Sequence, residues 1–150
     1  MIWFDYYKYM RDFMRKIILA LIVIIAVPFL SFAAFPVNYN AACDITEKDI
    51  AFKNDTYGIS VYATRPMKPM KEFTLTYKFD KPVKSVKFKS NMEMDMGKYE
   101  YEGKKVSDTE FTVNQTLVKC MSGRTKWYTK ADIIYMDGKT TTFYVFYDVK

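Results

Sequence analysis

The sequence predicts an all-β protein: an immunoglobulin-like antiparallel β-sandwich of about seven strands, preceded by an N-terminal signal or anchor helix. Three observations favour this fold. Residues 44–150 keep no helical period, apolar and polar residues alternate over short segments, and turn residues separate these segments. The 150 residues, 50% of them hydrophobic, are enough for one domain with a real core.

Strands are expected from residue 59 onward, with an additional one near 50–52. Their ranges are 59–63, 73–79, 86–88, 99–101, 111–113, 126–135 and 140–149. In 73–79 every second residue is apolar, and in 86–89 apolar residues alternate with lysines, which indicates an edge strand or a solvated sheet face. The pair Asp137-Gly138 between the last two segments predicts a tight β-hairpin.

The first 33 residues are typical of an export signal. Arg15 and Lys16 precede the apolar run 17–30, and the small residues after it fit a cut in front of Ala34. The aromatic extension 1–14 is longer than a usual basic region. It leaves open a later translation start and an uncleaved membrane anchor.

We therefore expect two parts, a signal peptide or membrane anchor at 1–33 and a single β-sandwich domain at 34–150. Cleaved or anchored, the domain is exported, either into the periplasm or facing it from the membrane. Its expected partner is an envelope or membrane protein of unknown identity, and it contacts the membrane only through an uncleaved leader.

The two cysteines, Cys43 and Cys120, are expected to form a structural disulfide, because an exported domain with an even cysteine count meets an oxidising compartment. A bridge across this separation would stabilise the fold by roughly 4 kcal/mol in the chain-entropy model. The sequence Asn40-Ala41-Ala42-Cys43 also leaves open lipidation of Cys43, as in bacterial lipoproteins.

Composition excludes several functions. The chain has no histidine, so it cannot build a Ser-His-Asp or Cys-His catalytic centre or a His-bearing zinc site. Residues 34–150 carry 19 Lys and Arg against 15 Asp and Glu, and only Arg65 and Arg124 are arginines. This mild net charge of +4, without clustered arginine, does not predict nucleic-acid binding. Close carboxylate pairs such as Glu93 and Asp95 are typical of solvated strands, so we expect no enzyme activity.

Methionines alternate with carboxylates in the segment 91–97. Thioether sulfur is a soft ligand that selects Cu(I), and Trp127 could cover a bound cation. The candidate ligands are Met92, Met94, Met96, Met67, Met70 and Met121. Residues four apart on a strand lie about 13 Å apart, so a pair such as Met94 and Met96 needs a third methionine from another segment. The same alternation equally fits a half-buried strand with methionine inward.

Several short motifs resemble the YtkA-like and FixH group of exported or membrane-tethered β-sandwich domains. They are the Met-Asp-Met-Gly run 94–97, Gly123 with Trp127, and the closing strand 143–145 after Gly138. The resemblance covers roughly residues 72–149. It implies a role in copper handling or cytochrome oxidase assembly, with metal binding on Met94 and Met96 first, Met92 next and Met121 last.

Two functions follow as hypotheses. The first is an exported, non-enzymatic domain that binds Cu(I) or another soft metal ion through methionines and exchanges it with a membrane partner. The second is an envelope interaction or structural module without metal. It would use an exposed aromatic patch composed of Tyr144, Phe146 and Tyr147, or of Tyr99 and Tyr101. The first requires methionine sulfurs that converge at an accessible rim, and the second requires buried methionines beside exposed aromatic rings.

Overall fold

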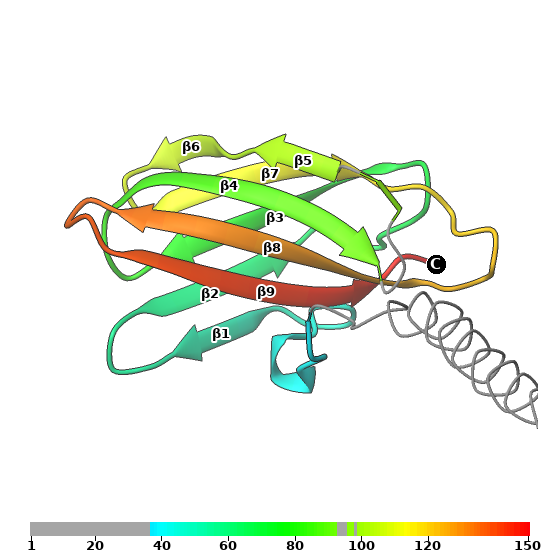
Figure 1. The fold of residues 1–150 in the computed structure, drawn as a ribbon, viewed down its shortest axis with the longest axis horizontal. Helices are drawn as coiled ribbons and strands as arrows, with labels where there is room; N and C mark the ends of the chain where they lie inside the picture. Colours follow the sequence, from blue (N-terminus) through cyan, green and yellow to red (C-terminus); the bar gives the residue numbers. More distant parts are fainter. Residues whose placement is uncertain (1–36, 93–95, 98) are drawn as a thin grey trace, which may run out of the picture. The chain divides into compact units, whose positions relative to one another are not determined.

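A computed structural model of the chain describes residues 37–92, 96–97 and 99–150. The predicted leader and Met94 lie outside the described residues. The described part contains one short 3-10 helix, η1, and nine strands (Figure 1). Their bounds are η1 Ala41–Cys43, β1 Ile50–Lys53, β2 Gly58–Ala63, β3 Glu72–Phe79, β4 Val83–Met92, β5 Tyr99–Glu102, β6 Lys104–Ser107, β7 Glu110–Thr116, β8 Lys126–Tyr135 and β9 Thr140–Asp148.

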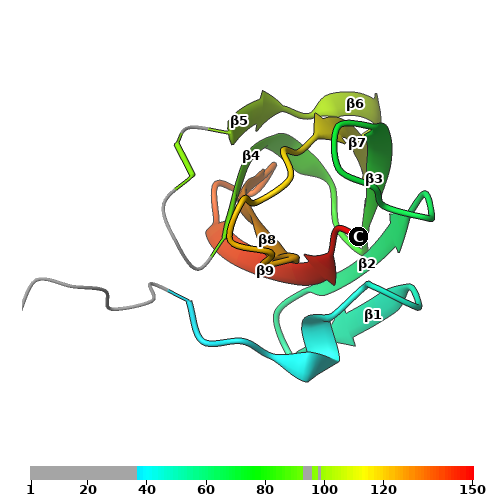
Figure 2. The ribbon, with the colours of Figure 1, turned by 90° about the vertical axis from the view of Figure 1, so that its right-hand side faces the viewer.

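The strands form two antiparallel sheets that face each other, as Figure 2 shows end-on. One sheet has five strands in the order β1-β2-β3-β7-β6, and the other has four in the order β5-β4-β8-β9. This confirms the predicted all-β sandwich of antiparallel sheets. The expected number of about seven strands is too low for the described residues. Strand β6 was missed because all four of its residues are exposed, so it shows no apolar alternation.

The predicted inward faces are confirmed. Phe73, Leu75, Tyr77 and Phe79 of β3 are all buried, and every second residue between them is more exposed. Strand β4 buries its apolar residues and exposes its lysines in the same way, but it lies between β5 and β8. Of the two interpretations of its lysines, the edge strand is therefore wrong and the solvated sheet face is right.

The C-terminal hairpin is confirmed. Strands β8 and β9 pair from Lys126 with Asp148 to Ile134 with Thr140. Gly138 in the connecting turn has φ of 82°, a left-handed conformation that costs glycine little because it has no Cβ. The turn closes with a 2.9 Å hydrogen bond from the Tyr135 amide to the Lys139 carbonyl.

The chain changes sheets at a single residue, Gly103. Strand β5 pairs with β4 in one sheet, and β6 pairs with β7 in the other. A Cβ atom at Gly103 would lie 2.6 Å from Cε2 of Phe88, closer than real contacts allow. Glycine is needed here because the backbone crosses directly over the core phenylalanine.

The core between the sheets is aromatic but has a polar cluster inside it. Ser90, Gln115, Thr129 and Tyr147 are all at most 1% exposed, and they come from β4, β7, β8 and β9. The hydroxyl of Tyr147 donates to Gln115 Oε1 at 2.9 Å and lies 2.6 Å from the hydroxyl of Thr129. The Ser90 hydroxyl lies 2.8 Å from that of Thr129. Burial is tolerable for these groups because they satisfy one another.

A second core tyrosine provides a contrast. Tyr77 is as fully buried as Tyr147, but its hydroxyl has no hydrogen-bond partner within the described part of the chain. A buried hydroxyl without a partner loses its hydration without replacement, which costs about 1–3 kcal/mol. The two tyrosines therefore have similar rings and opposite polar environments.

We predict opposite effects from removing the two hydroxyls. Tyr147→Phe should lower the free energy of unfolding by about 1–3 kcal/mol, because Gln115 and Thr129 lose a buried partner. Tyr77→Phe should leave it unchanged or raise it. Urea denaturation of both variants measures the difference, and equal losses would contradict this assignment of the buried cluster.

Candidate binding surface at the loop end

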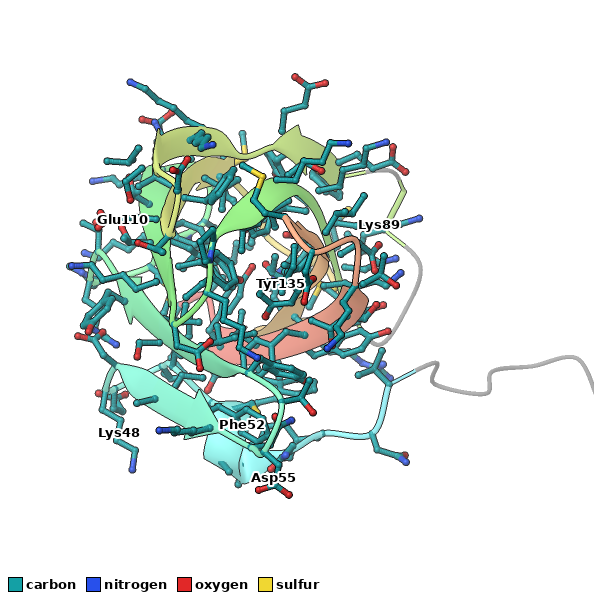
Figure 3. The ribbon with its side chains drawn as sticks, turned by 90° about the vertical axis from the view of Figure 1, so that its left-hand side faces the viewer. Lys48, Phe52, Asp55, Lys89, Glu110 and Tyr135 are labelled. Carbon is teal, nitrogen blue, oxygen red and sulfur yellow. The ribbon has the colours of Figure 1, made fainter. Side chains whose placement is uncertain are left out.

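The antiparallel strands place their connections at two opposite ends of the sandwich. One end, here called the turn end, consists of the four short connections 54–57, 80–82, 108–109 and 136–139. Backbone hydrogen bonds link them, for example from Val83 to Asp108 at 2.7 Å and from Met136 to Pro82 at 3.0 Å. Figure 3 views the sandwich from this end.

The opposite end, here called the loop end, includes the longer connections 64–71 and 117–125, and strand β4 ends and strand β1 begins there as well. The two loops are joined by a 2.8 Å hydrogen bond from the Met70 amide to the Leu117 carbonyl. After β9, the Val149 amide donates to Thr125 at 2.9 Å and the Lys150 amide to Met67 at 3.2 Å. These contacts hold the two loops and the end of β9 together (Figure 2).

The methionines predicted as ligands all belong to this end, as far as the structure describes them. Met67 and Met70 lie in the first loop, Met121 in the second, and Met92 and Met96 at and just beyond the end of β4. Their surroundings differ. Met67 and Met92 are 5% and 2% exposed, Met96 is half-buried, and Met70 and Met121 are 68% and 103% exposed.

These exposures decide what the methionines can do together. Two sulfurs that share one ion lie within a few ångströms of each other and cover each other's surface. Met121 is fully exposed, so nothing covers it, whereas Met92 pairs with Trp127 in the β4–β8 register and lies in the core. The structure therefore gathers the methionines at one end without bringing Met121 against Met92.

Trp127 is also part of the core. Its side chain is 1% exposed, and its ring packs edge-on against Tyr99 with 5.5 Å between ring centroids. A ring in this position stabilises the junction of β5 and β8. It has no open face at the surface, so it does not cover a cation there in the way the sequence predicts.

The predicted disulfide is not formed. Cys43 and Cys120 are both among the described residues and both buried, but the structure does not join them. Cys43 belongs to η1, which is followed by a bridge from Asp44 to Phe146 of β9, whereas Cys120 belongs to the β7–β8 loop and its sulfur lies 3.0 Å from the Ser122 hydroxyl. An even number of cysteines does not show whether the fold brings the two residues together, so the sequence could not reveal that Cys43 and Cys120 stay apart. Burial raises the pKa of the Cys43 thiol, and the hydrogen bonds with Ser122 lower that of Cys120.

The predicted aromatic patch is largely covered. Phe146 and Tyr147 are buried, and Tyr99, Tyr101 and Tyr144 are half-buried. Tyr147 faces the core. Phe146 faces outward but is covered by the segment before β1, whose Tyr39 ring packs edge-on against it at 5.2 Å.

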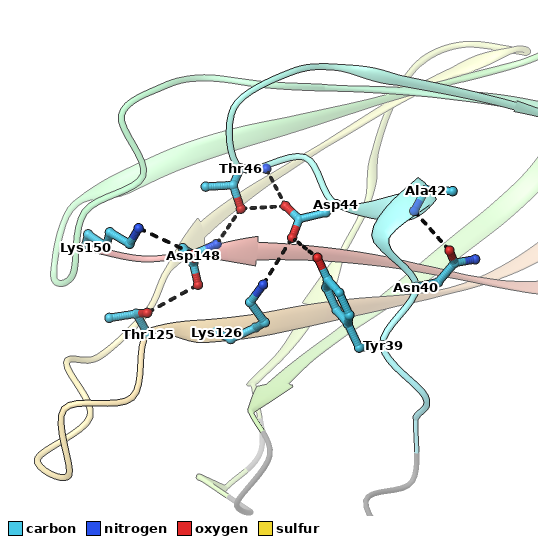
Figure 4. A network of polar contacts seen from close by, with 9 residues as sticks. All are labelled: Tyr39, Asn40, Ala42, Asp44, Thr46, Thr125, Lys126, Asp148 and Lys150. Carbon is cyan, nitrogen blue, oxygen red and sulfur yellow. Dashed lines mark hydrogen bonds and ion pairs between the residues drawn. The ribbon is translucent and has the colours of Figure 1, made fainter.

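A polar network fixes this segment on the outer face of β8 and β9 (Figure 4). The Asp44 carboxylate accepts hydrogen bonds from the Tyr39 hydroxyl at 2.7 Å and from the amide and hydroxyl of Thr46 at 2.9 and 2.6 Å. It also pairs with Lys126 at 3.2 Å, and the Lys126 ammonium lies 4.3 Å from the centre of the Tyr39 ring. The Asp148 amide donates to the Thr46 hydroxyl at 3.0 Å.

The hydrogen bonds of this network shift the pKa values of Asp44 and Tyr39. Burial alone would raise the pKa of Asp44, but the hydrogen bonds from Thr46, Tyr39 and Lys126 outweigh burial, and the pKa falls below its usual value. The hydrogen bond with Asp44 raises the pKa of Tyr39. A carboxyl with a lowered pKa stabilises the fold above its unfolded pKa of about 3.9 and loses that contribution as pH falls through the folded pKa.

The loops 64–71 and 117–125 differ in charge from the turns at the other end. The two loops 64–71 and 117–125 contain five basic residues and no acidic ones, whereas the segment before β1, which meets the same end, contains Asp44, Glu47 and Asp49. The basic residues are Arg65, Lys68, Lys71, Lys119 and Arg124. The turn-end connections contain four aspartates and two lysines. Asp49 offsets Arg65 through a 2.8 Å ion pair. The positive charge of the loop end is therefore confined to these two loops, and it could be found in the sequence only by grouping connections according to strand direction.

A pocket of about 210 Å³ opens at the turn end, lined in part by Tyr57, Lys81, Tyr135 and Lys139. The hydroxyl of Tyr135 is covered, and it has no hydrogen-bond partner among the residues described. Burial, with the charge of Asp80, raises its pKa to about 12. A molecule in this pocket would not reach the hydroxyl, so the loop end is the better candidate for a binding surface.

Two further searches cover the described residues alone. They contain no group of three or more His, Cys, Asp or Glu side chains placed to hold a metal ion. Within the same residues, no helix is long and apolar enough to cross a membrane.

No protein-family model and no curated protein sequence matches the chain. The resemblance to the YtkA-like and FixH group stays a prediction that rests on its short motifs.

We predict that the Asp44 network stabilises the fold in a pH-dependent way. Asp44→Asn should lower the free energy of unfolding by about 1–3 kcal/mol at pH 7, because the hydrogen bonds and the ion pair lose the negative charge. The deficit should begin to shrink below the unfolded pKa of about 3.9, because the unfolded wild-type chain then takes up a proton at Asp44, and it should be lost as pH falls through the lower folded pKa. The Ile45 amide, which donates to Phe146, should exchange faster.

Urea denaturation at pH 7 and pH 3, with hydrogen exchange at pH 7, measures these effects. Asp55→Asn at the turn end is the control, since it removes the same charge from an exposed connection. An Asp44→Asn deficit of equal size at both pH values would show that the carboxylate charge is not responsible.

Proposed function

We propose that the chain is an exported, non-enzymatic domain of the cell envelope that binds its partner with the loop end. The observation that carries this proposal is the combination of basic loops with two exposed methionines, Met70 and Met121, at one end. The leader pattern at 1–33 supports export, with the domain periplasmic or anchored facing the periplasm. The two-sheet architecture supports an immunoglobulin-like sandwich, a fold that often presents binding loops at one end.

The loop end suits binding better than the predicted aromatic patch. Large apolar side chains at a surface are free to enter an interface only if their own fold does not cover them. Met70 and Met121 meet this condition, whereas Phe146 and Tyr147 are buried. The hydrogen bond between Met70 and Leu117 also gives the two loops a defined spacing, which limits the ordering cost of binding.

We predict that partners contact position 121 and not position 136. Met121 lies in the loop end and Met136 in the turn end, and both are exposed. A photo-crosslinking amino acid is introduced at each position in turn, in the full chain expressed in a Gram-negative bacterium. In the exported chain, only the variant at position 121 should crosslink to another protein. Cell fractionation should recover the chain outside the cytoplasm, and its intact mass separates a cut before Ala34 from an anchored chain. Cytoplasmic retention, or equal adducts from both positions, would contradict the proposal.

Soft-metal binding is the second candidate. It is favoured by one observation, that every described candidate methionine belongs to the loop end. A site there would need Met121 to fold back toward Met70 or Met96, since Met67 and Met92 lie in the core. With Cu(I) bound in this way, the domain would serve metal handling or oxidase assembly, as the family resemblance implies.

The thioether hypothesis predicts one Cu(I) bound per chain in competition with a chelator. Replacing Met94, Met96 and Met121 by Leu should abolish binding, because leucine keeps the apolar volume and removes the sulfur. Met136→Leu should leave binding unchanged, since Met136 is exposed at the turn end. If the triple variant and the wild-type domain gave the same Cu(I) titration curve, the methionines would not be metal ligands, and their roles would be packing and surface contact alone.

A further inference from the structure

We infer that two copies of the chain pair through one edge of β9, the stretch 140–144. This edge lies on the side of the sandwich, so the inference concerns a different surface from the loop end and goes beyond the proposed function. Three observations carry it: the direction of the backbone groups along the edge, the absence of charge there, and the match between two identical edges.

Strand β9 ends the four-stranded sheet and is the lower strand of the front sheet in Figure 1. At the two ends of the β8–β9 pairing, the Tyr135 amide donates to Lys139 and the Val149 amide donates to Thr125. Residues of an antiparallel strand direct their backbone groups alternately toward and away from the neighbouring strand, so the odd-numbered residues of β9 bond with β8. The even-numbered residues therefore direct their amides and carbonyls outward from the sheet.

The chain itself covers one part of this edge. The Ile45 amide donates to the Phe146 carbonyl at 2.8 Å, and the Asp148 amide donates to the Thr46 hydroxyl at 3.0 Å. Earlier in β9, the outward backbone groups have no hydrogen-bond partner within the described part of the chain at three positions, Thr140, Thr142 and Tyr144. Thr140 and Thr142 are exposed and Tyr144 is half-buried. Unpaired backbone groups at a strand edge are a template for pairing with another chain.

The stretch 140–144 contains no charged residue, unlike the other strands that end the two sheets. Strand β1 ends with Lys53, β5 contains two glutamates, and β6 begins with two lysines. Charged side chains are the usual protection of an edge strand against pairing with another chain. Strand β9 lacks this protection over the residues whose backbone groups are unpaired.

The charges beside this stretch, on β8 and in the adjoining turn, are paired within the chain. Lys130 and Asp132 of β8 lie 2.8 Å apart, and Lys139 and Asp137 of the turn lie 3.8 Å apart. The Thr142 hydroxyl also donates to Asp132 at 2.7 Å. Two identical edges with these neighbours can therefore approach each other without like charges opposed.

Two copies of this edge match each other when they run antiparallel. With Thr142 opposite Thr142 of the second copy, Thr140 lies opposite Tyr144, and each of the three pairs can exchange two backbone hydrogen bonds. Pairs of threonine with threonine and of threonine with an aromatic residue stabilise adjacent strands. The paired stretch ends at Tyr144, because Ile45 of the same chain occupies the edge at Phe146. A second copy is thus the occupant that supplies the right groups at the right spacing.

The dimer has a defined geometry. A two-fold axis at Thr142 joins the two four-stranded sheets into one sheet, with the same surface used by both copies. Strand β1 packs behind β9, where Phe52 contacts Phe143 with 5.5 Å between ring centroids, and it does not pair with the edge. Because β9 runs from the turn end to the loop end, the loop ends of the two copies point in opposite directions.

The test uses residues 34–150, which contain the compact unit Val37–Lys150 with all nine described strands. Sedimentation velocity should show monomer at about 5 µM and mostly dimer at about 500 µM, since so short a paired stretch gives a weak, concentration-dependent dimer.

Matched variants locate the interface. Thr142→Pro removes an amide that β8 does not use, and Thr142→Lys places a charge at the two-fold axis. Each should weaken dimerisation by about tenfold or more, because both copies lose hydrogen bonds or meet a like charge. Val106→Lys on the exposed edge strand β6 should leave dimerisation unchanged. Urea denaturation confirms that each variant is folded.

Cysteine variants test the register. Thr142→Cys should form a disulfide-linked dimer under mild oxidation, because the two-fold axis places residue 142 opposite itself. Thr140→Cys should not, since its counterpart lies about 13 Å along the strand, but mixing it with Tyr144→Cys should restore the link. The unmodified chain, with buried Cys43 and Cys120, is the control for the native thiols.

Three results would overturn the inference: a monomer at about 500 µM, equal effects of Thr142→Lys and Val106→Lys, or equal oxidation of Thr140→Cys and Thr142→Cys. A monomer at that concentration would leave the edge to a strand from another protein. The crosslinks from position 121 test the loop end separately, so failure of the dimer would leave the proposed function standing.

Discussion

The pairing of β8 with both β4 and β9 is the constraint on which the rest of the structure depends. Side chains along a strand alternate between two faces, so a shift of one residue would exchange the core and solvent faces of β8. The observed register aligns Met92 with Trp127 on one side and Tyr147 with Trp127 on the other. It therefore fixes the inward direction of Trp127 and Thr129 at once.

Both polar networks follow from this register. Inward, Thr129 meets Ser90 and Tyr147, and Gln115 of the facing sheet completes the buried cluster. Outward, Lys126 meets Asp44, which holds the segment before β1. A slip of β8 by one residue would place Lys126 toward the core and leave Asp44 without its cation. The cost of that slip is far larger than the worth of either network, because it would also expose the aromatic face.

Antiparallel topology also sorts the charges. Consecutive connections leave the sandwich at opposite ends, so alternate connections collect at the same end. Aspartates occur in all four short turns, and side-chain oxygens close two of these turns: Asp137 accepts from the Lys139 amide, and Asn54, beside Asp55, accepts from the Thr56 and Tyr57 amides. The longer connections 64–71 and 117–125 have no aspartate, and they carry lysine, arginine and methionine instead. The difference in charge between these two loops and the turns thus arises partly from the turn chemistry, because the turns select aspartate and the loops do not.

Sequence alternation predicted the sheets well because it reports burial directly, as in Phe73 to Phe79 and in the hairpin at Gly138. It failed where burial gave no signal, in the exposed strand β6. Alternation also does not report which residues far apart in the sequence lie close together in space. It therefore could not predict the ion pair of Asp44 with Lys126 or the separation of Cys43 from Cys120. The methionines illustrate the same limit, because an alternation with period two arises from metal binding and from packing alike. What separates these roles is the exposure of each side chain: Met92 is enclosed beside Trp127, whereas Met121 has its whole surface available for contact with something outside the fold.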